Sequence, residues 1–226
     1  MGQRIEDIAA LIPAFNAENT LDVLLSRLLD YIPSQRVLVV NDGSNDGTAN
    51  IAKRRDVRVL TLEFNQGKGA ALRKGFDVLQ QEQGIKDVVT LDADLQHRPE
   101  DLITFVEKKR QTGADIVIGL RSRIGTRMPI HRRLSNAITS FLISMRTGTS
   151  VLDSQCGYRL IGKNVLSNVS FQSSGFEAET EFLIRAIKKG FSIAFAPIET
   201  IYDGAPSHMT NWKTTTDFVR ILFRDY

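Results

Sequence analysis

Short β-rich runs alternate with amphipathic stretches along most of this 226-residue chain. Runs typical of strands occupy residues 8–12, 36–40, 57–62, 88–91, 116–119, 158–161 and 192–196. Between them, apolar residues recur at helical spacing over residues 17–29, 48–55, 69–83, 99–112, 132–145, about 177–188 and about 212–223. The pattern predicts strands and helices in alternation, with the regular order loosening after Gly148.

This alternation predicts an α/β fold with a doubly wound, mostly parallel sheet. Several strand candidates are apolar throughout, as expected where helices cover both faces of a sheet. No repeat, low-complexity tract or linker interrupts the chain, so residues 1–226 are expected to form a single domain. In such folds ligands bind at the carboxyl ends of the strands, so the residues that follow the strands are the first candidates for a site.

Composition limits the class of protein and its location. The net charge is only +3, and basic residues are not interleaved with aromatic ones, so nucleic-acid binding is not expected. The single cysteine, Cys156, excludes an intrachain disulfide and fits a reducing compartment. No apolar run reaches the roughly 18 residues of a membrane-spanning helix, and the N-terminus does not fit a secretory signal. These features predict a cytoplasmic protein, either soluble or peripheral on the inner face of a membrane.

Positive charge is concentrated in one block. Between Ile116 and Leu152 there are six arginines, at positions 121, 123, 127, 132, 133 and 146, and no acidic residue. Arginine side chains bind phosphate oxygens through paired hydrogen bonds, so the block suits an anionic ligand or an acidic membrane surface. A solvated helix face is the alternative. The amphipathic, basic segment at 214–223 suits either a membrane surface or packing on the core.

The most informative local pattern is a buried strand that ends in two acids, Asp92 and Asp94, followed by Gln96 and His97. Mg²⁺ and Mn²⁺ prefer oxygen ligands and are commonly shared between one or two carboxylates and substrate phosphates. Two acids at one strand end would repel each other without a cation between them. Capping of the next helix explains the acids after Pro99 but not the pair at 92 and 94. The pattern predicts a divalent metal site.

Two glycine-containing turns also follow strands. In the turn at 41–48, Asn45 or Asp46 can cap a helix, and Asp42 can accept hydrogen bonds from a base or a ribose. A plain capped turn is the alternative there. The segment 65–70, which contains Lys68, fits neither a P-loop nor a dinucleotide fingerprint, although its glycines permit close backbone approach and a helix N-terminus favours anions.

Three acids, Glu177, Glu179 and Glu181, open a later helix. A favourable interaction with the helix dipole accounts for them, and one of them can instead be a general base.

Taken together, these segments resemble the inverting glycosyltransferases with the GT-A fold (family 2), and most closely the dolichyl- and polyprenyl-phosphate sugar transferase branch. The matching segments follow the family order from about residue 8 to 210 and are 12–16, 39–44, 65–69, 92–97 with 99–102, and 153–159. Several independent motifs in the right order make the resemblance specific.

The resemblance implies a function for each of these segments. The half up to about residue 120 would bind the nucleotide and the half from 121 to 226 the acceptor. The residues that it implies for nucleotide binding are Pro13, Phe15, Glu18, Asp42, Lys68 and Asp92; for Mg²⁺ or Mn²⁺, Asp92, Asp94 and Gln96; and for the acceptor phosphate, Arg121, Arg132, Arg133 and Ser135. Asp94, Arg121 and Glu179 would be the catalytic residues. Glu179 is included because it lies six residues before Arg185, where other branches have a catalytic acid before a helix arginine.

Two positions depart from the family pattern. Asn41 stands where the family often has the first of two acids, and Ala17 stands where an acid commonly follows the first-strand Asn, with Glu18 one place later. Neither position belongs to the implied metal site. The C-terminal membrane spans of some relatives have no counterpart, which leaves membrane contact to the arginine block and the terminal segment.

The expected reaction is a metal-dependent transfer of a hexose, with inversion, from a UDP- or GDP-linked sugar to a polyprenyl or dolichyl phosphate. A phosphate acceptor is already anionic and needs arginines more than it needs a base, which favours it over a hydroxyl. The alternatives are transfer to a saccharide or protein hydroxyl with Glu179 as base, a nucleotidyltransferase, and a nucleotide-sugar-binding protein without catalysis. The sequence does not identify the sugar, the nucleotide base or the oligomeric state.

Overall fold

The computed structural model describes residues 4–121, 130–199 and 221, and for residues 130–132 it describes the backbone alone. Within these ranges a seven-stranded sheet runs in the order β3-β2-β1-β4-β6-β5-β7. Its strands are β1 (Ile8–Ala14), β2 (Val37–Asn41), β3 (Arg58–Thr61), β4 (Asp87–Thr90), β5 (Ile116–Arg121), β6 (Arg159–Gly162) and β7 (Ile193–Ile198). The helices are α1 (Leu21–Leu28), α2 (Thr48–Arg54), α3 (Lys68–Leu79), α4 (Leu102–Thr112), α5 (Ile130–Thr147), α6 (Lys163–Asn168) and α7 (Ala178–Lys188), with short 3₁₀ turns at Ser34–Arg36 and Pro99–Asp101.

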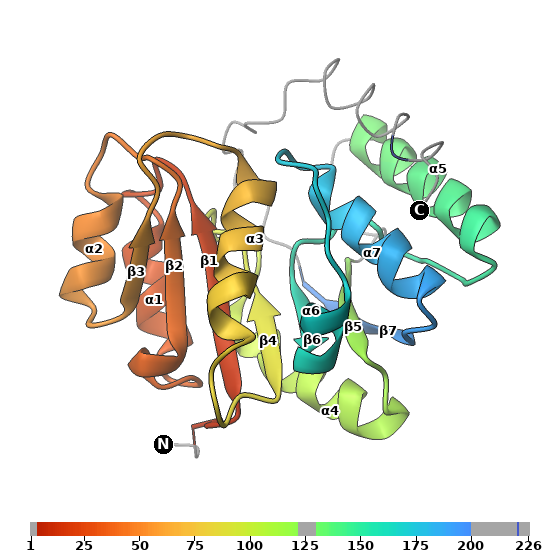
Figure 1. Ribbon diagram of the computed structural model, residues 1–226, viewed down its shortest axis with the longest axis horizontal. Helices are drawn as coiled ribbons and strands as arrows, with labels where there is room; N and C mark the ends of the chain where they lie inside the picture. The colour runs from red at the N-terminus through yellow and green to blue at the C-terminus, as the bar shows by residue number, and fades with distance from the viewer. Residues whose placement is uncertain (1–3, 122–129, 200–220, 222–226) are drawn as a thin grey trace.

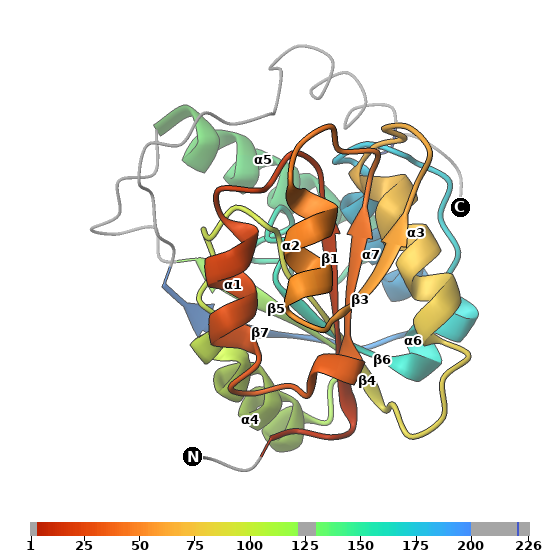
Figure 2. The same ribbon diagram turned by 90° about the vertical axis from the view of Figure 1, so that its left-hand side faces the viewer.

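The helices form a layer on each face of the sheet. Figures 1 and 2 show α3, α6 and α7 on one face and α1 and α4 on the other, with α2 beside α1. In both views α5 lies beyond the edge at which β1 and β2 end. The structure thus confirms the doubly wound α/β fold expected from the sequence.

Strand direction divides the sheet into two parts. β1 pairs in parallel with β2 and with β4, and β2 pairs in parallel with β3. β6 lies between β4 and β5 and is antiparallel to both, whereas β7 returns parallel to β5. The order of the parallel strands reverses at β1, because β2 lies on one side of it and β4 on the other. Folds of this kind bind ligands beside that reversal, outside the carboxyl ends of the strands.

The core consists of the apolar strands and of one stripe on each covering helix. All seven residues of β1 and all five of β2 are buried, as predicted for strands covered on both faces. On α1 the stripe consists of Leu21, Leu24, Leu25 and Leu28, each without exposed surface. Full burial of one such leucine contributes about 1.5–3 kcal/mol, so this stripe alone holds α1 firmly against the sheet.

The strand and helix ranges differ from the sequence prediction in a few places. The helix expected from residue 17 begins at Leu21, and in the turn before it the backbone N–H groups of Ala17 and Glu18 donate to Thr48 and Asp46. The six-residue α6 was not predicted, since it is too short to show a helical period. The strand predicted at 158–161 is present as β6, but its antiparallel direction was not foreseen. The helix expected at 212–223 lies outside the described residues except for Ile221.

Gly75 gives a test of how tightly α3 packs on the sheet. A Cβ at this position would overlap both methyl groups of Leu11 on β1, and Leu11 has no exposed surface into which it can move. We expect Gly75→Ala to lower the free energy of unfolding by about 1–3 kcal/mol through overpacking. Asp77→Ala, at an exposed position of the same helix, should change it by less than about 0.5 kcal/mol. Urea unfolding followed by circular dichroism measures both, and equal stabilities would contradict the packing argument.

Candidate active site

Asp92 and Asp94 follow β4 directly, beside the point where the strand order reverses. Asp94 lies at an exposed position, and its Oδ1 accepts a hydrogen bond from the backbone N–H of Gln96 at 3.0 Å. Between Asp94 and Gln96, the backbone of Leu95 has a φ of 61°, a left-handed conformation that branched apolar residues rarely adopt. This turn carries the chain away from β4 while both acids stay at the strand end.

The electrostatics of this pair fit a divalent cation. Desolvation by the surrounding protein and the nearby negative charge of Asp92 raise the pKa of Asp94 to about 6. Burial opposes ionisation of Asp92 too, but Lys68 outweighs it and lowers the pKa of Asp92. Among the described residues no three His, Cys, Asp or Glu side chains cluster as metal ligands. Two carboxylates at one strand end suit a divalent ion that prefers oxygen ligands and that also binds a diphosphate.

Lys68 makes two ion pairs, one of which joins the two halves of the chain. Its Nζ lies 2.6 Å from Oδ1 of Asp92 and 2.9 Å from Oε2 of Glu179, and its side chain is only 12% exposed. Burial by itself lowers the pKa of Lys68, but the two carboxylates outweigh burial and raise it. Sequence analysis placed Lys68 in a nucleotide site and Glu179 in a catalytic role, and the structure brings these two side chains into contact.

Two glycines allow Lys68 and Glu179 to meet. At Gly69, a Cβ would lie 2.5 Å from both the Cβ of Ala178 and the carbonyl oxygen of Ser173. Its backbone N–H instead donates to the carbonyl of Ser174 at 2.7 Å. Gly67 has a φ of 93°, and a side chain there would also strike Ser174. The start of α3 can therefore lie directly on the loop that precedes α7.

Gly157 has a similar function on the opposite side of the ion pair. A Cβ at this position would lie 2.6 Å from Oδ2 of Asp92 and 3.0 Å from Nζ of Lys68. Glycine is the residue that lets this backbone approach both charged groups.

Asp42 is almost fully buried and holds the next loop in place. Its two carboxylate oxygens accept hydrogen bonds from the backbone N–H groups of Gln66 and Gly67, each at 2.8 Å. This gives Asp42 a structural function that the sequence did not indicate. Its contact with a nucleoside stays a prediction.

The loop after β1 is bound to the loop after β2. Oε2 of Glu18 accepts from the N–H of Gly47 at 2.8 Å, and Asp46 accepts from the N–H of Thr48 at the start of α2. The N-cap of α2 is Gly47, so neither Asn45 nor Asp46 takes the capping position that the sequence suggested, although Asp46 still contacts the first residue of the helix. Pro13 is buried near the end of β1, and Phe15 is 37% exposed just beyond it. Pro13, Phe15 and Glu18 thus lie together at the carboxyl edge, and their part in binding a nucleotide stays a prediction.

Arg121 ends β5 and is paired with a buried acid. Its Nε and Nη2 lie 2.8 Å and 2.9 Å from the two carboxylate oxygens of Asp153, which also accepts from Asn136 on α5 at 2.9 Å. Burial opposes ionisation of Asp153, but the hydrogen bonds and charge of Arg121 lower its pKa. A bidentate partner fixes the direction of the Arg121 side chain.

The other predicted acceptor residues lie at the start of α5. Arg133 is half-buried and Ser135 is exposed, while the side chain of Arg132 lies outside the described residues. Arg123 and Arg127 also lie outside them. The expected binding of a phosphate by this group stays a prediction.

Two buried charged residues shape the site in ways that the sequence did not indicate, since Arg159 was noted only within the family segment 153–159 and Glu181 only as one of three acids at a helix start. Arg159, 2% exposed, donates to the carbonyl oxygens of Cys156, Ser154 and Glu179 at 2.8–2.9 Å. Glu181 has no exposed surface and accepts from the N–H groups of Gln172 and Ser173 and from Arg185. The signal for Arg159 was a charged residue opening an apolar strand, and for Glu181 a position on the apolar face of its helix.

Comparison with known sequences gives consistent matches. The model of glycosyl transferase family 2 matches residues 9–170. An undecaprenyl-phosphate mannosyltransferase of Micrococcus luteus is 32% identical over 202 residues, which cover 84% of this chain and 82% of that protein. A polyprenol monophosphomannose synthase of Mycolicibacterium smegmatis is 30% identical over 204 residues, which cover 83% of this chain and 75% of that protein.

Solved structures give the same fold. Glucosyl-3-phosphoglycerate synthase from Mycobacterium tuberculosis, in complex with Mn²⁺, uridine diphosphate and phosphoglyceric acid, matches with a TM-score of 0.73 at 20% identity. The match covers 96% of this chain and 76% of that chain. It confirms the GT-A fold expected from the sequence. No helix of the described residues is both long and apolar enough to cross a membrane.

Arg159 provides a stability test of the site's framework. Arg159→Met keeps the length of the side chain but leaves three buried carbonyl groups without their donor. We expect the free energy of unfolding to fall by about 2–4 kcal/mol. Arg58→Met, which removes a partly exposed ion pair with Glu82, should cost less than about 1 kcal/mol. Thermal and urea unfolding compare the two variants, and a loss at Arg159 no larger than that at Arg58 would contradict a framework role.

Proposed function

Because the chain belongs to glycosyl transferase family 2, we propose that it moves a hexose from a UDP- or GDP-linked donor to a polyprenyl phosphate, with inversion at the sugar. The observation on which this proposal depends most is the group of charged residues beside the strand reversal. Asp92 and Asp94 lie at the end of β4, and Lys68 links Asp92 to Glu179 on the acceptor side. Both the donor diphosphate and an acceptor can reach this edge of the sheet.

On this proposal, the donor diphosphate binds at the end of β4 with a divalent ion. Asp92 and Asp94, with Gln96 beside them, would hold Mg²⁺ or Mn²⁺, which stabilises negative charge on the leaving diphosphate. The likeness in fold to a synthase whose structure contains Mn²⁺ and uridine diphosphate supports this assignment. Pro13, Phe15, Glu18 and Asp42 lie around the neighbouring loops and would contact the nucleoside. Lys68 adds a positive charge within reach of the same phosphates.

The two relatives at 30–32% identity, both named for polyprenyl or undecaprenyl phosphate, support a lipid-phosphate acceptor. A physical argument points the same way. The carboxylate of Glu179 is held by Lys68, so its use as a base toward a hydroxyl requires that this ion pair open. A phosphate acceptor is already anionic and needs no base. It needs cations that position it, and Arg121, Arg133 and Arg132 are the candidates, with Ser135 as a further donor.

Transfer to a saccharide or protein hydroxyl is the second candidate function. The observation that favours it is the position of Glu179. Its carboxylate shares Lys68 with Asp92, one of the proposed metal ligands, although Glu179 belongs to the acceptor half. Glycosyltransferase activity is common to both candidates, so their difference lies in the acceptor alone.

A donor and acceptor screen tests the proposal. UDP- and GDP-sugars are incubated with Mn²⁺ or Mg²⁺, with and without undecaprenyl or dolichyl phosphate, and both nucleotide release and glycolipid are measured. We expect transfer to the lipid that is abolished by EDTA and reduced more than about 100-fold in Asp94→Ala, because charge stabilisation by a metal is worth several kcal/mol. Asp77→Ala serves as control for the loss of an exposed acid. If nucleotide is released at the same rate with and without the lipid, the acceptor is a hydroxyl and not a lipid phosphate.

Glu179→Gln separates the two candidate acceptors. If the acceptor is a phosphate, the kcat for lipid transfer should fall less than about tenfold, whereas loss of a general base costs about 10²–10⁴. Glu177→Gln, next to the same helix start, controls for the loss of a negative charge there. A loss of about 1000-fold confined to Glu179→Gln would assign it as a base and contradict the phosphate acceptor.

A further inference from the structure

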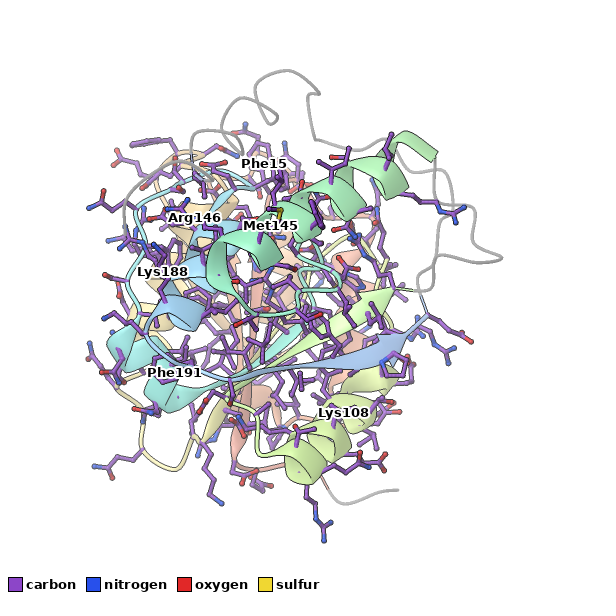
Figure 3. All side chains as sticks on the ribbon, turned by 90° about the vertical axis from the view of Figure 1, so that its right-hand side faces the viewer. Phe15, Lys108, Met145, Arg146, Lys188 and Phe191 are labelled. Carbon is purple, nitrogen blue, oxygen red and sulfur yellow. The ribbon has the colours of Figure 1, made fainter. Side chains whose placement is uncertain are left out.

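Helix α5 turns an apolar face to solvent. The exposed large apolar side chains of the helix, which are between 40% and 69% accessible, are Leu134, Ile138, Phe141, Leu142 and Met145. Their spacing places them along one side of an 18-residue helix. Figure 3 shows α5 crossing the upper part of the molecule, with Met145 and Arg146 labelled near its C-terminal end. Several large apolar side chains exposed along one helix face indicate an interaction surface more strongly than apolar residues exposed singly.

The buried face of the same helix is largely polar. Asn136, Thr139 and Ser140 are each less than 9% exposed. Asn136 donates to Asp153 at 2.9 Å, and the hydroxyl of Ser140 bonds to that of Ser154 at 3.1 Å. Turning the apolar side inward would leave these polar groups and Asp153 without their partners, at a cost of about 1–3 kcal/mol for each. The outward direction of the apolar side is therefore fixed by the fold.

A cavity adjoins this face and leads toward Arg121. It has a volume of about 750 Å³, lies between α5, the end of β5 and the end of β7, and is lined mainly by apolar side chains. Phe141 belongs both to the exposed face of α5 and to the cavity wall, and Leu152 is exposed at the wall as well. The exposed face and the cavity form one apolar surface, and the Arg121–Asp153 ion pair lies at the cavity wall.

The segment of chain that carries this surface is basic. No acidic residue occurs between Ile116 and Leu152, and Arg133 and Arg146 lie on α5 itself. Asp153, the next acid along the chain, is buried in an ion pair with Arg121. A protein partner would meet the same apolar face, but a segment rich in arginine and without acids of its own matches an anionic lipid surface best.

We propose that the exposed face of α5, defined by Leu134, Ile138, Phe141, Leu142 and Met145, docks on a lipid bilayer that contains anionic headgroups. The helix lies in the interface with its apolar side among the acyl chains, and the arginines contact the headgroups. This docking goes beyond the proposed function, because it is a binding property that requires neither donor nor turnover. It would also place the cavity that leads to Arg121 at the membrane.

Vesicle sedimentation tests the docking directly. The full chain is mixed with vesicles of phosphatidylcholine containing phosphatidylglycerol, and the partition coefficient is compared with that of Ile138→Gln combined with Met145→Gln. Neither residue lines the cavity that leads to Arg121. The matched control is Val23→Gln combined with Phe64→Gln, because exposures of 47% and 63% are similar to 50% and 69% in the α5 pair. We expect the α5 variant to partition at least about tenfold more weakly than the wild type and the control. Both pairs replace exposed side chains, and unchanged circular dichroism spectra and melting temperatures verify folding.

Several outcomes would overturn the docking. One is vesicle binding that is equal in the α5 variant and the control, and another is no binding by the wild type. A dimer that dissociates only in the α5 variant, without vesicle binding, would assign the face to a second copy of the chain.

Transfer to a short, water-soluble prenyl phosphate keeps this test separate from the proposed function. The α5 variant should retain that activity while it loses vesicle binding. Loss of the soluble activity in this variant would show that Ile138 or Met145 acts in the reaction and not in docking. If the wild type binds vesicles but transfers no sugar to any prenyl phosphate, the docking stands and the proposed acceptor is wrong.

Discussion

The two ion pairs of Lys68 set the geometry on which the rest of the site depends. A lysine that is 12% exposed with carboxylates at 2.6 Å and 2.9 Å requires its partners, because an unpaired buried charge is strongly unfavourable. Asp92 comes from the end of β4 and Glu179 from the first turn of α7, so one ammonium group joins parts of the chain that are far apart in sequence. The glycines at 67, 69 and 157 leave the room in which these groups meet.

Buried polar groups hold the loops around this centre. Asp42 holds the loop before α3, Arg159 holds the turn before β6 together with the start of α7, and Glu181 holds the loop before α7. Each accepts from or donates to backbone groups, so the loops are fixed by their main chain and leave their exposed side chains available for ligands. This arrangement suits a site whose residues must be in position before the substrate arrives.

The sequence was sufficient for the fold class, for most strands and helices, and for the position of the acids at 92 and 94 after a strand, because apolar periodicity and residues at strand ends are local signals. It could not show that Asp42 would bind the backbone of Gln66 and Gly67, since the partners are 24 and 25 positions away. For the same reason the sequence could not show the contact of Arg121 with Asp153. Arg121 is one of the residues that were predicted to bind an acceptor phosphate. The antiparallel direction of β6 also depends on tertiary pairing, which the residues of the strand itself do not indicate. Burial of a charged residue such as Arg159 is visible only once its three carbonyl partners are in place.

The insertion of β6 between β4 and β5 has a consequence for the chain as it leaves the ribosome. The first four strands, complete by Thr90, already form a parallel sheet, but the outer edge of β4 has no partner until residues 159–162 have been made. β5 is synthesised earlier and cannot close this edge in the native order, because its own partners are β6 and β7. An apolar strand with an open edge is prone to pair with other chains. Until β6 has been made, the edge of β4 in the nascent N-terminal half is therefore a place where another chain can pair.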